Sequence, residues 1–208
     1  MKGYWINHVV EIRDAERFGA YAAASKPLLQ GNNQYGAKIM LFGPVAATLL
    51  GKPVQHAAIV EFDSVQAAVD FWHDSDYSTA RALMGPLENE SAVVDRRVCC
   101  IEAEPLTLSA RQGIWVNHVQ EIINEPAFFR YAEASMPHFE SVIFGQVVHQ
   151  HTGEQKIQLA AALGFDNVGT ATKIYDTPEY AAALAAGGME GGEGLVVNRT
   201  ICAVEVPE

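Results

Sequence analysis

The sequence holds only three cysteines, Cys99, Cys100 and Cys202, among 208 residues. Cysteines so few and so unevenly spaced argue against a disulfide framework and a four-ligand zinc site, and they favour a reducing, cytoplasmic environment. Basic residues are also scarce, because 14 Lys and Arg face 25 Asp and Glu, for a net charge of −11. This charge has the wrong sign for holding phosphate groups in number, so we expect neither nucleic acid nor a membrane as a partner.

Long hydrophobic runs are missing as well. The longest apolar region, residues 39–50, is interrupted by Gly43 and Pro44, and the first 16 residues carry acids where a signal peptide needs an apolar stretch. A hydrophobic content of 49% is nevertheless enough for a buried core. These features predict a soluble cytoplasmic protein of one or two domains.

The chain repeats itself. Residues 3–27 read GYWINHVVEIRDAERFGAYAAASKP, and residues 113–137, 110 positions later, read GIWVNHVQEIINEPAFFRYAEASMP. Further along, EFDSVQAA at 61–68 aligns with IYDTPEYA at 174–181, and DRRVCCIE at 95–102 aligns with NRTICAVE at 198–205. We therefore predict two copies of one unit, 1–106 and 111–208, with the second helical region shortened by ten residues in the second copy.

Each copy has the pattern strand, helix, strand, strand, helix, strand. Residues 4–12 alternate as a strand does, and Asp14 is the N-cap of the helix that follows; Ser64 caps the second helix. In the second copy, Asn124 and Thr177 are the expected caps. The predicted fold class is α+β: two ferredoxin-like βαββαβ units in tandem, their sheets paired face to face as an intrachain dimeric α/β barrel.

Several motifs carry a family resemblance. The opening GYWI.HV and D.E.F..Y, the pairs Tyr35-Gly36 and Phe144-Gly145 before the second strand, EFDS after the third strand, and FW.DS.Y at 71–77 resemble the domain of unknown function 1330 family. The resemblance implies a dimeric α/β barrel and no agreed activity, because that superfamily includes cofactor-free monooxygenases, isomerases, haem enzymes and ligand binders. Members often carry an arginine on the second strand, which this sequence lacks.

The first strand supplies the candidate ligand-binding residues. Its period of two places Trp5, Asn7, Val9 and Glu11 on one face. The second copy retains all four residues, as Trp115, Asn117, Val119 and Glu121. We interpret this face as the barrel interior, where the tryptophans form a wall and the amides and carboxylates orient a small organic molecule. The alternative is a structural network along the seam between the copies.

His8 and His118 are the histidines that both copies share, on the opposite face of the same strand. An imidazole is suited to general acid or base chemistry near neutral pH, so these two are candidate catalytic residues together with Glu11 and Glu121. The alternative interpretation is a hydrogen-bonded core histidine on a face otherwise suited to packing beneath helices.

His149 and His151 lie two residues apart on the second strand of the second copy, a spacing that supplies two metal ligands. A third ligand is not defined by the sequence, although Glu154 and His138 are nearby candidates, so no metal is predicted.

Two functions follow. The first is a small enzyme that uses no organic cofactor and acts by acid–base chemistry on a small organic molecule in the barrel. The second is a non-catalytic barrel that binds such a molecule as sensor, carrier or accessory subunit. Both predict a ligand, and exposed helices and sheet edges are compatible with a homodimer of the two-copy barrel.

Overall fold

The structure, a computed structural model, describes residues 1–86 and 89–208 with their side chains and residues 87–88 by backbone only. The elements of the first half are β1 (Lys2–Ile12), α1 (Ala15–Ser25), η1 (Lys26–Leu29), β2 (Lys38–Leu50), β3 (His56–Phe62), α2 (Val65–Trp72), α3 (Ser75–Ala82), η2 (Leu87–Ala92) and β4 (Val94–Ala103). The elements of the second half are β5 (Gly113–Ile122), α4 (Glu125–Ser135), η3 (Met136–His138), β6 (Ser141–Thr152), β7 (Leu159–Phe165), α5 (Val168–Lys173), η4 (Ile174–Asp176), α6 (Pro178–Ala186), η5 (Glu193–Leu195) and β8 (Val197–Glu205).

Side-chain caps fix where the helices begin. The Asp14 carboxylate accepts a hydrogen bond from the backbone N–H of Arg17 at the start of α1, and Ser64 accepts one from Ala67 at the start of α2. Asn124 and Thr177 cap α4 and α6 in the same way. Each cap satisfies a backbone N–H that has no partner within the helix, so all four predicted caps are confirmed.

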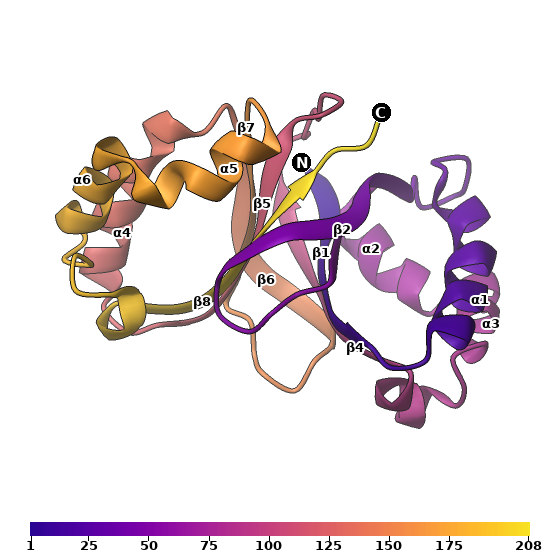
Figure 1. Ribbon diagram of the computed structural model, residues 1–208. Helices are drawn as coiled ribbons and strands as arrows, with labels where there is room; N and C mark the ends of the chain where they lie inside the picture. The colour runs from indigo at the N-terminus through magenta and orange to yellow at the C-terminus, as the bar shows by residue number, and fades with distance from the viewer.

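The eight strands close into an antiparallel barrel in the order β1-β3-β2-β8-β5-β7-β6-β4. Strand β2 pairs with β8 and β4 pairs with β6, so each half contributes four strands and the two halves join at two seams. Figure 1 shows α1–α3 on one side of the barrel and α4–α6 on the other. The predicted α+β barrel is confirmed.

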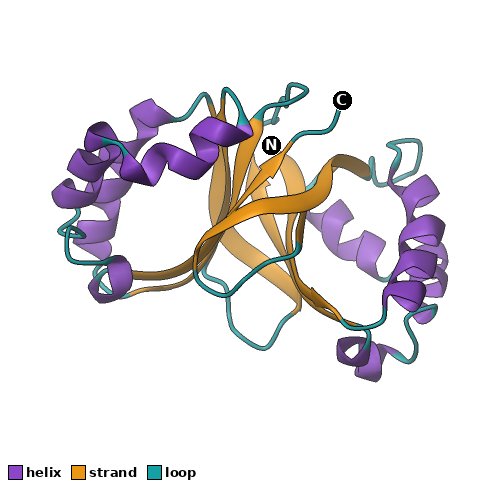
Figure 2. Cartoon of the chain, in the orientation of Figure 1, coloured by secondary structure: helices purple, strands orange, loops and turns teal.

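The barrel has a packed interior and two outer layers (Figure 2). The interior core is built mostly of small and branched side chains, among them Ile6, Ala57, Cys99, Val116 and Ala160. An interior of eight strands is just wide enough for such side chains to fill. Two further cores, rich in aromatic residues, lie between the sheet and the helices of each half.

The assignment of faces on β1 is wrong in the sequence prediction. Trp5 and Val9 lie in the outer core beneath the helices, whereas Tyr4, Ile6 and His8 lie on the interior face. Trp5 packs in the space between the sheet and the helices. There it contacts the aromatic rings of Phe62, Phe71, Trp72 and Tyr77. Both faces of β1 are buried, so its polarity did not reveal which face the barrel encloses.

The alignment of the second helical regions also needs correction. The backbone of Gly3 lies against that of Ser64, and Gly113 lies in the same way against Asn167, so EFDS of the first half corresponds to GFDN at 164–167. The segment between the third and fourth strands covers 63–93 in the first half and 166–196 in the second, which is the same length. The expected shortening of this region is therefore wrong; the shorter segment precedes β6, at 139–140 against 30–37.

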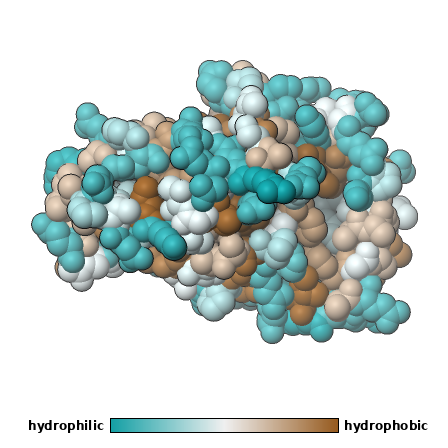
Figure 3. Space-filling model, turned by 45° about the horizontal axis from the view of Figure 1, so that its top comes forward, coloured by the Kyte–Doolittle hydropathy of each residue, from teal (hydrophilic) through white to brown (hydrophobic). Residues whose placement is uncertain are grey.

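Among the described residues, no helix is both long and apolar enough to span a membrane. On the face drawn in Figure 3, hydrophobic residues reach the surface in patches that hydrophilic side chains separate. Exposed large hydrophobic residues include Phe42 of β2 and its counterpart Phe144 of β6. A homodimer stays a prediction.

Candidate functional site

Each half has a pocket between its first helix and the outward face of the sheet. The first pocket, about 750 Å³, lies under α1 and η1 and is closed at one side by Val206 and Pro207 from the C-terminal end of the chain. The second pocket, about 410 Å³, lies under α4. Both volumes fall in the range of small-molecule sites.

Most of the lining of the first pocket is apolar, with Phe18, Leu29, Ile39 and Val60 among the walls. The second pocket has the same character, with Phe128, Phe139, Val142 and Leu163. A pocket of this kind holds the apolar body of an organic molecule, while a few polar groups fix its orientation.

An asparagine from the first strand of each half points into each pocket. Asn7 lines the first pocket and Asn117 the second. The side-chain oxygen of each is buried and has no hydrogen-bond partner among the described residues. A buried amide without a partner costs free energy, so its presence at the same place in both halves is best accounted for by a ligand.

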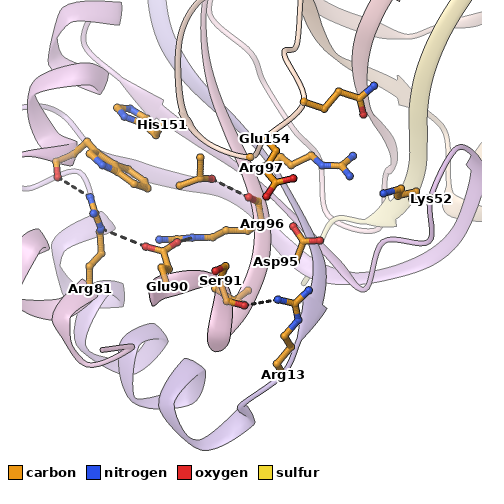
Figure 4. A pocket seen from close by; sticks show the side chains of 15 residues that line it. Arg13, Lys52, Arg81, Glu90, Ser91, Asp95, Arg96, Arg97, His151 and Glu154 are labelled. Carbon is orange, nitrogen blue, oxygen red and sulfur yellow. Dashed lines mark hydrogen bonds and ion pairs between the residues drawn. The ribbon is translucent and has the colours of Figure 1, made fainter. Parts of the chain in front are cut away.

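Arg96 of β4 forms the polar end of the first pocket. Its Nε donates to Glu90 at 2.6 Å and its Nη1 donates to the Tyr21 hydroxyl at 2.8 Å, while Nη2 is buried and unpartnered among the described residues. The Tyr21 hydroxyl is also hydrogen bonded to that of Tyr77, at 2.7 Å. Glu90 additionally lies 3.8 Å from Nε of Arg81, as Figure 4 shows. One carboxylate thus faces two guanidinium groups.

Arg199 of β8 occupies the same position in the second half. It donates to Glu193 through Nε at 2.6 Å and through Nη2 at 2.7 Å, and Nη2 also lies 3.2 Å from the Tyr175 hydroxyl. Leu184 stands where the first half has Arg81. This cluster is a closed bidentate ion pair without excess charge, whereas the Arg96 cluster has one positive charge in excess and a free donor.

No curated protein matches the chain in sequence. Residues 2–96 match the sequence model of the DUF1330 family, a domain of unknown function. The DUF1330 match thus covers Asn7, Tyr21 and Arg96 of the first pocket, and also Glu90, which pairs with Arg96.

Solved structures share the fold along the whole chain. An anthrone oxidase-like protein is 8% identical with a TM-score of 0.58, over 100% of this chain and 91% of its own. A Lactobacillus acidophilus protein whose proposed activity is that of a monooxygenase is 14% identical with a TM-score of 0.53, over 98% and 93%. A chlorite dismutase variant from Candidatus Nitrospira defluvii is 9% identical with a TM-score of 0.50, over 99% and 91%. These are likenesses of fold.

His8 and His118 meet in the barrel interior. Their rings stack with centroids 3.9 Å apart, and burial lowers the pKa of His8 to about 4 and that of His118 well below its ordinary value. Neither lines the two pockets, so the structure brings the histidines to each other and not to Asn7 or Asn117.

Glu11 and Glu121 lie at exposed strand ends, beyond a β-bulge that follows Val9 and Val119. The bulge interrupts the period of two, which is why these carboxylates do not continue the face of Asn7 and Asn117. Glu11 pairs with Arg13 at 3.0 Å. Trp5 lines the first pocket, and the indoles of Trp5 and Trp115 donate to the carbonyl oxygens of Ala68 and Ala171.

His149 and His151 have ring centroids 4.6 Å apart on β6. Within the part of the chain that the structure describes, no third His, Cys, Asp or Glu joins them in a metal-binding group. His151 instead stacks on Trp72 at 4.2 Å.

The sequence prediction missed Arg96, Glu90 and Tyr21 together with their counterparts Arg199, Glu193 and Tyr131. Identity between the two halves marks these residues too: Arg96/Arg199 and Glu90/Glu193 match at an offset of 103, and Tyr21/Tyr131 match at an offset of 110. What the sequence does not show is that β4 and the first helix face the same pocket as Asn7.

Proposed function

We propose that the protein binds a small organic molecule in the first pocket. The observation that carries this proposal is the pair of buried, unpartnered polar atoms, Oδ1 of Asn7 and Nη2 of Arg96, in a pocket that is otherwise mostly apolar. An apolar body fits the walls, and an oxygen-bearing group on the ligand satisfies the guanidinium N–H.

The finer proposal is an enzyme that uses no organic cofactor and acts on this molecule by proton transfer. The guanidinium of Arg96 is suited to stabilising negative charge that develops on a ligand oxygen, because its buried Nη2 has no acceptor among the described residues, and Oδ1 of Asn7 is suited to accepting a hydrogen bond from the ligand. The Tyr21 hydroxyl also lines the pocket, next to Arg96 and Tyr77, and is the proton-carrying group in this arrangement. His8, His118, Glu11 and Glu121 were predicted for this role but line neither pocket, so Tyr21 takes their place in the proposal.

The second candidate function is a non-catalytic barrel that binds the same ligand as sensor or carrier. It is favoured by the position of all four predicted acid–base residues outside the pockets. Tyr21→Phe separates the two functions. In an enzyme this variant loses turnover and keeps ligand binding, whereas in a carrier it has no activity to lose.

We also propose that 1–106 and 111–208 are two diverged copies of one domain. Support comes from the shared element order and from the matched pairs Asn7/Asn117, Arg96/Arg199 and Glu90/Glu193. In this proposal the first copy binds the ligand, because the larger pocket and the free guanidinium donor both belong to it.

Native mass spectrometry of the purified protein tests the proposal, with the uncharged N-phenyl-1-naphthylamine as an added apolar probe. Ala58 lines the first pocket and its counterpart Ala161 lines the second. We expect a bound small molecule or probe on the folded chain that Ala58→Leu removes and Ala161→Leu retains. Unchanged binding in Ala58→Leu, with both variants folded by circular dichroism, rules out the first pocket.

A further inference from the structure

A further cavity, separate from the first and second pockets, lies beside the first pocket at the seam where β4 pairs with β6. It has a volume of about 640 Å³ and is formed by β4 and η2 of the first half together with the end of β6 and the turn that follows it. We call it the cationic cleft, because five of its lining residues carry a positive charge: Arg13, Lys52, Arg81, Arg96 and Arg97. Figure 4 shows Arg81, Glu90 and Arg96 at one end of the cleft and Arg97 and Lys52 at the other.

Arg97 is the unusual member of this group. The residue is 6% exposed, and among the described residues its side chain has neither an ion pair nor a hydrogen bond. A buried guanidinium is normally paired, since removing a charge from water is costly. The guanidinium nitrogens of Arg97 are not among the fully buried atoms that lack a partner, so this unpaired charge opens into the cleft, where an anion can reach it.

The carboxylates that line the cleft do not pair with Arg97. Glu90, Asp95 and Glu154 line it, but Glu90 is already shared between Arg81 and Arg96. Neither Asp95 nor Glu154 lies within ion-pairing distance of a cation among the described residues. His151 adds no charge at neutral pH, because burial lowers its pKa to about 3. Five cations and three carboxylates line the cleft, and Arg13 also pairs with Glu11 at 3.0 Å, which leaves one positive charge in excess in a chain of net charge −11.

The other seam of the barrel lacks these cations. The positions that match Arg13, Arg81 and Arg97 are Ile123, Leu184 and Thr200. Thr200 accepts a hydrogen bond from Gln120 at 3.2 Å, so a neutral pair stands where the first half has Arg97. Closing the barrel thus does not require cations at this place, and their presence at one seam alone points to a binding role.

We infer that the cationic cleft is a second ligand site, which binds a small molecule through a phosphate or carboxylate group. Arginine forks and a lysine ammonium are the groups that recognise both oxyanions. The cleft is of metabolite size, and the negative charge of the remaining chain disfavours a polyanion such as nucleic acid. The site is separate from the first pocket, with which it shares only Arg96.

Isothermal titration calorimetry of the full chain tests this inference. The buffer has an ionic strength of about 20 mM, so that charges are little screened. Inorganic pyrophosphate represents phosphate ligands and citrate represents carboxylate ligands. We expect one of the two to bind, and binding to weaken at least about tenfold in Arg97→Gln and severalfold in Lys52→Gln. Lys52 is exposed, so its variant keeps the fold even if Arg97→Gln does not.

Arg130→Gln is the matched control, because it removes the same charge from an exposed position on α4, away from the cleft. Binding in this variant should equal that of the unaltered protein. The inference is overturned if neither probe binds, or if Lys52→Gln and a folded Arg97→Gln both bind as tightly as Arg130→Gln. Ala58→Leu, which fills the first pocket, should leave anion binding intact, so this test stands apart from that of the proposed function.

Discussion

The imidazoles of His8 and His118 stack in the middle of the barrel, and each points its Nε2 at a carbonyl oxygen of the opposite half. His8 Nε2 lies 3.1 Å from the oxygen of Val116, and His118 Nε2 lies 3.2 Å from that of Ile6. These reciprocal bonds link β1 to β5 through the interior. The two histidines are therefore neutral cross-links between the halves, and each Nε2 carries the proton that it donates.

This arrangement predicts acid sensitivity. The unfolded chain binds protons at these histidines below their ordinary pKa of 6.5, whereas the fold keeps His8 neutral down to about pH 4. Stability is therefore fully present above pH 6.5 and falls with the pH below it, by up to about 1.4 kcal/mol per pH unit for each such histidine.

Urea unfolding between pH 6.5 and 5 measures this slope. The double variant His8→Leu, His118→Leu should have a clearly smaller slope than the unaltered protein. Equal slopes in the two proteins would show that the histidine pair titrates in the same way folded and unfolded.

Replacing the buried asparagine of the first pocket should maintain or raise the stability of the protein and abolish ligand binding. Asn7→Leu replaces a buried amide whose oxygen has no partner, so without ligand the free energy of unfolding should stay constant or rise by about 1 kcal/mol. Ligand or probe binding in the first pocket should be lost, while Asn117→Leu should retain it. A loss of stability above about 1 kcal/mol in Asn7→Leu contradicts the ligand-binding role and favours a structural one.

Local sequence rules predicted much of the fold. Capping residues such as Asp14 and Asn124 act through backbone atoms within one turn, so they are readable from sequence alone. The period of two on β1 separated Trp5 and Asn7 from His8 correctly. The barrel encloses either the face of Asn7 or the face of His8, and the size of side chains from other strands decides which. The polarity of the β1 residues does not reveal this.

The site was harder to predict for a related reason. Arg96 and Asn7 line the same pocket because β4 pairs with β1, and Tyr21 reaches Arg96 from a helix 75 residues away in the chain. Such contacts are set by packing between elements. The identity of Arg96 and Arg199 at matching positions of the two halves marks the position in the sequence, but the free Nη2 of Arg96 follows from Arg81, which is Leu184 at the matching position of the second half.

The two glutamates predict unequal losses of stability. Glu90→Gln leaves two largely buried guanidinium groups, Arg81 and Arg96, without a carboxylate, whereas Glu193→Gln leaves only Arg199. Removing one partner of a buried ion pair costs about 3–5 kcal/mol. We expect urea unfolding to give the larger loss for Glu90→Gln. A larger loss for Glu193→Gln would mean that the bidentate geometry of Arg199 outweighs the second charge.

The cysteines predict a chain that resists thiol reagents when folded. Burial raises the pKa of Cys100 to about 12 and that of Cys202 to about 12, and the pKa of Cys99 well above its ordinary value. The thiolate is the reactive form, so none of the three should react with 5,5′-dithiobis(2-nitrobenzoic acid) at pH 8 in the folded protein, and all three should react in urea. Trp5→Leu opens the packing around Cys100, so reaction there should become measurable while Cys202, in the other half, stays protected. A buried neutral thiol loses its proton only when the structure around it opens. Rapid reaction of one thiol in the unaltered protein would therefore identify an activated cysteine.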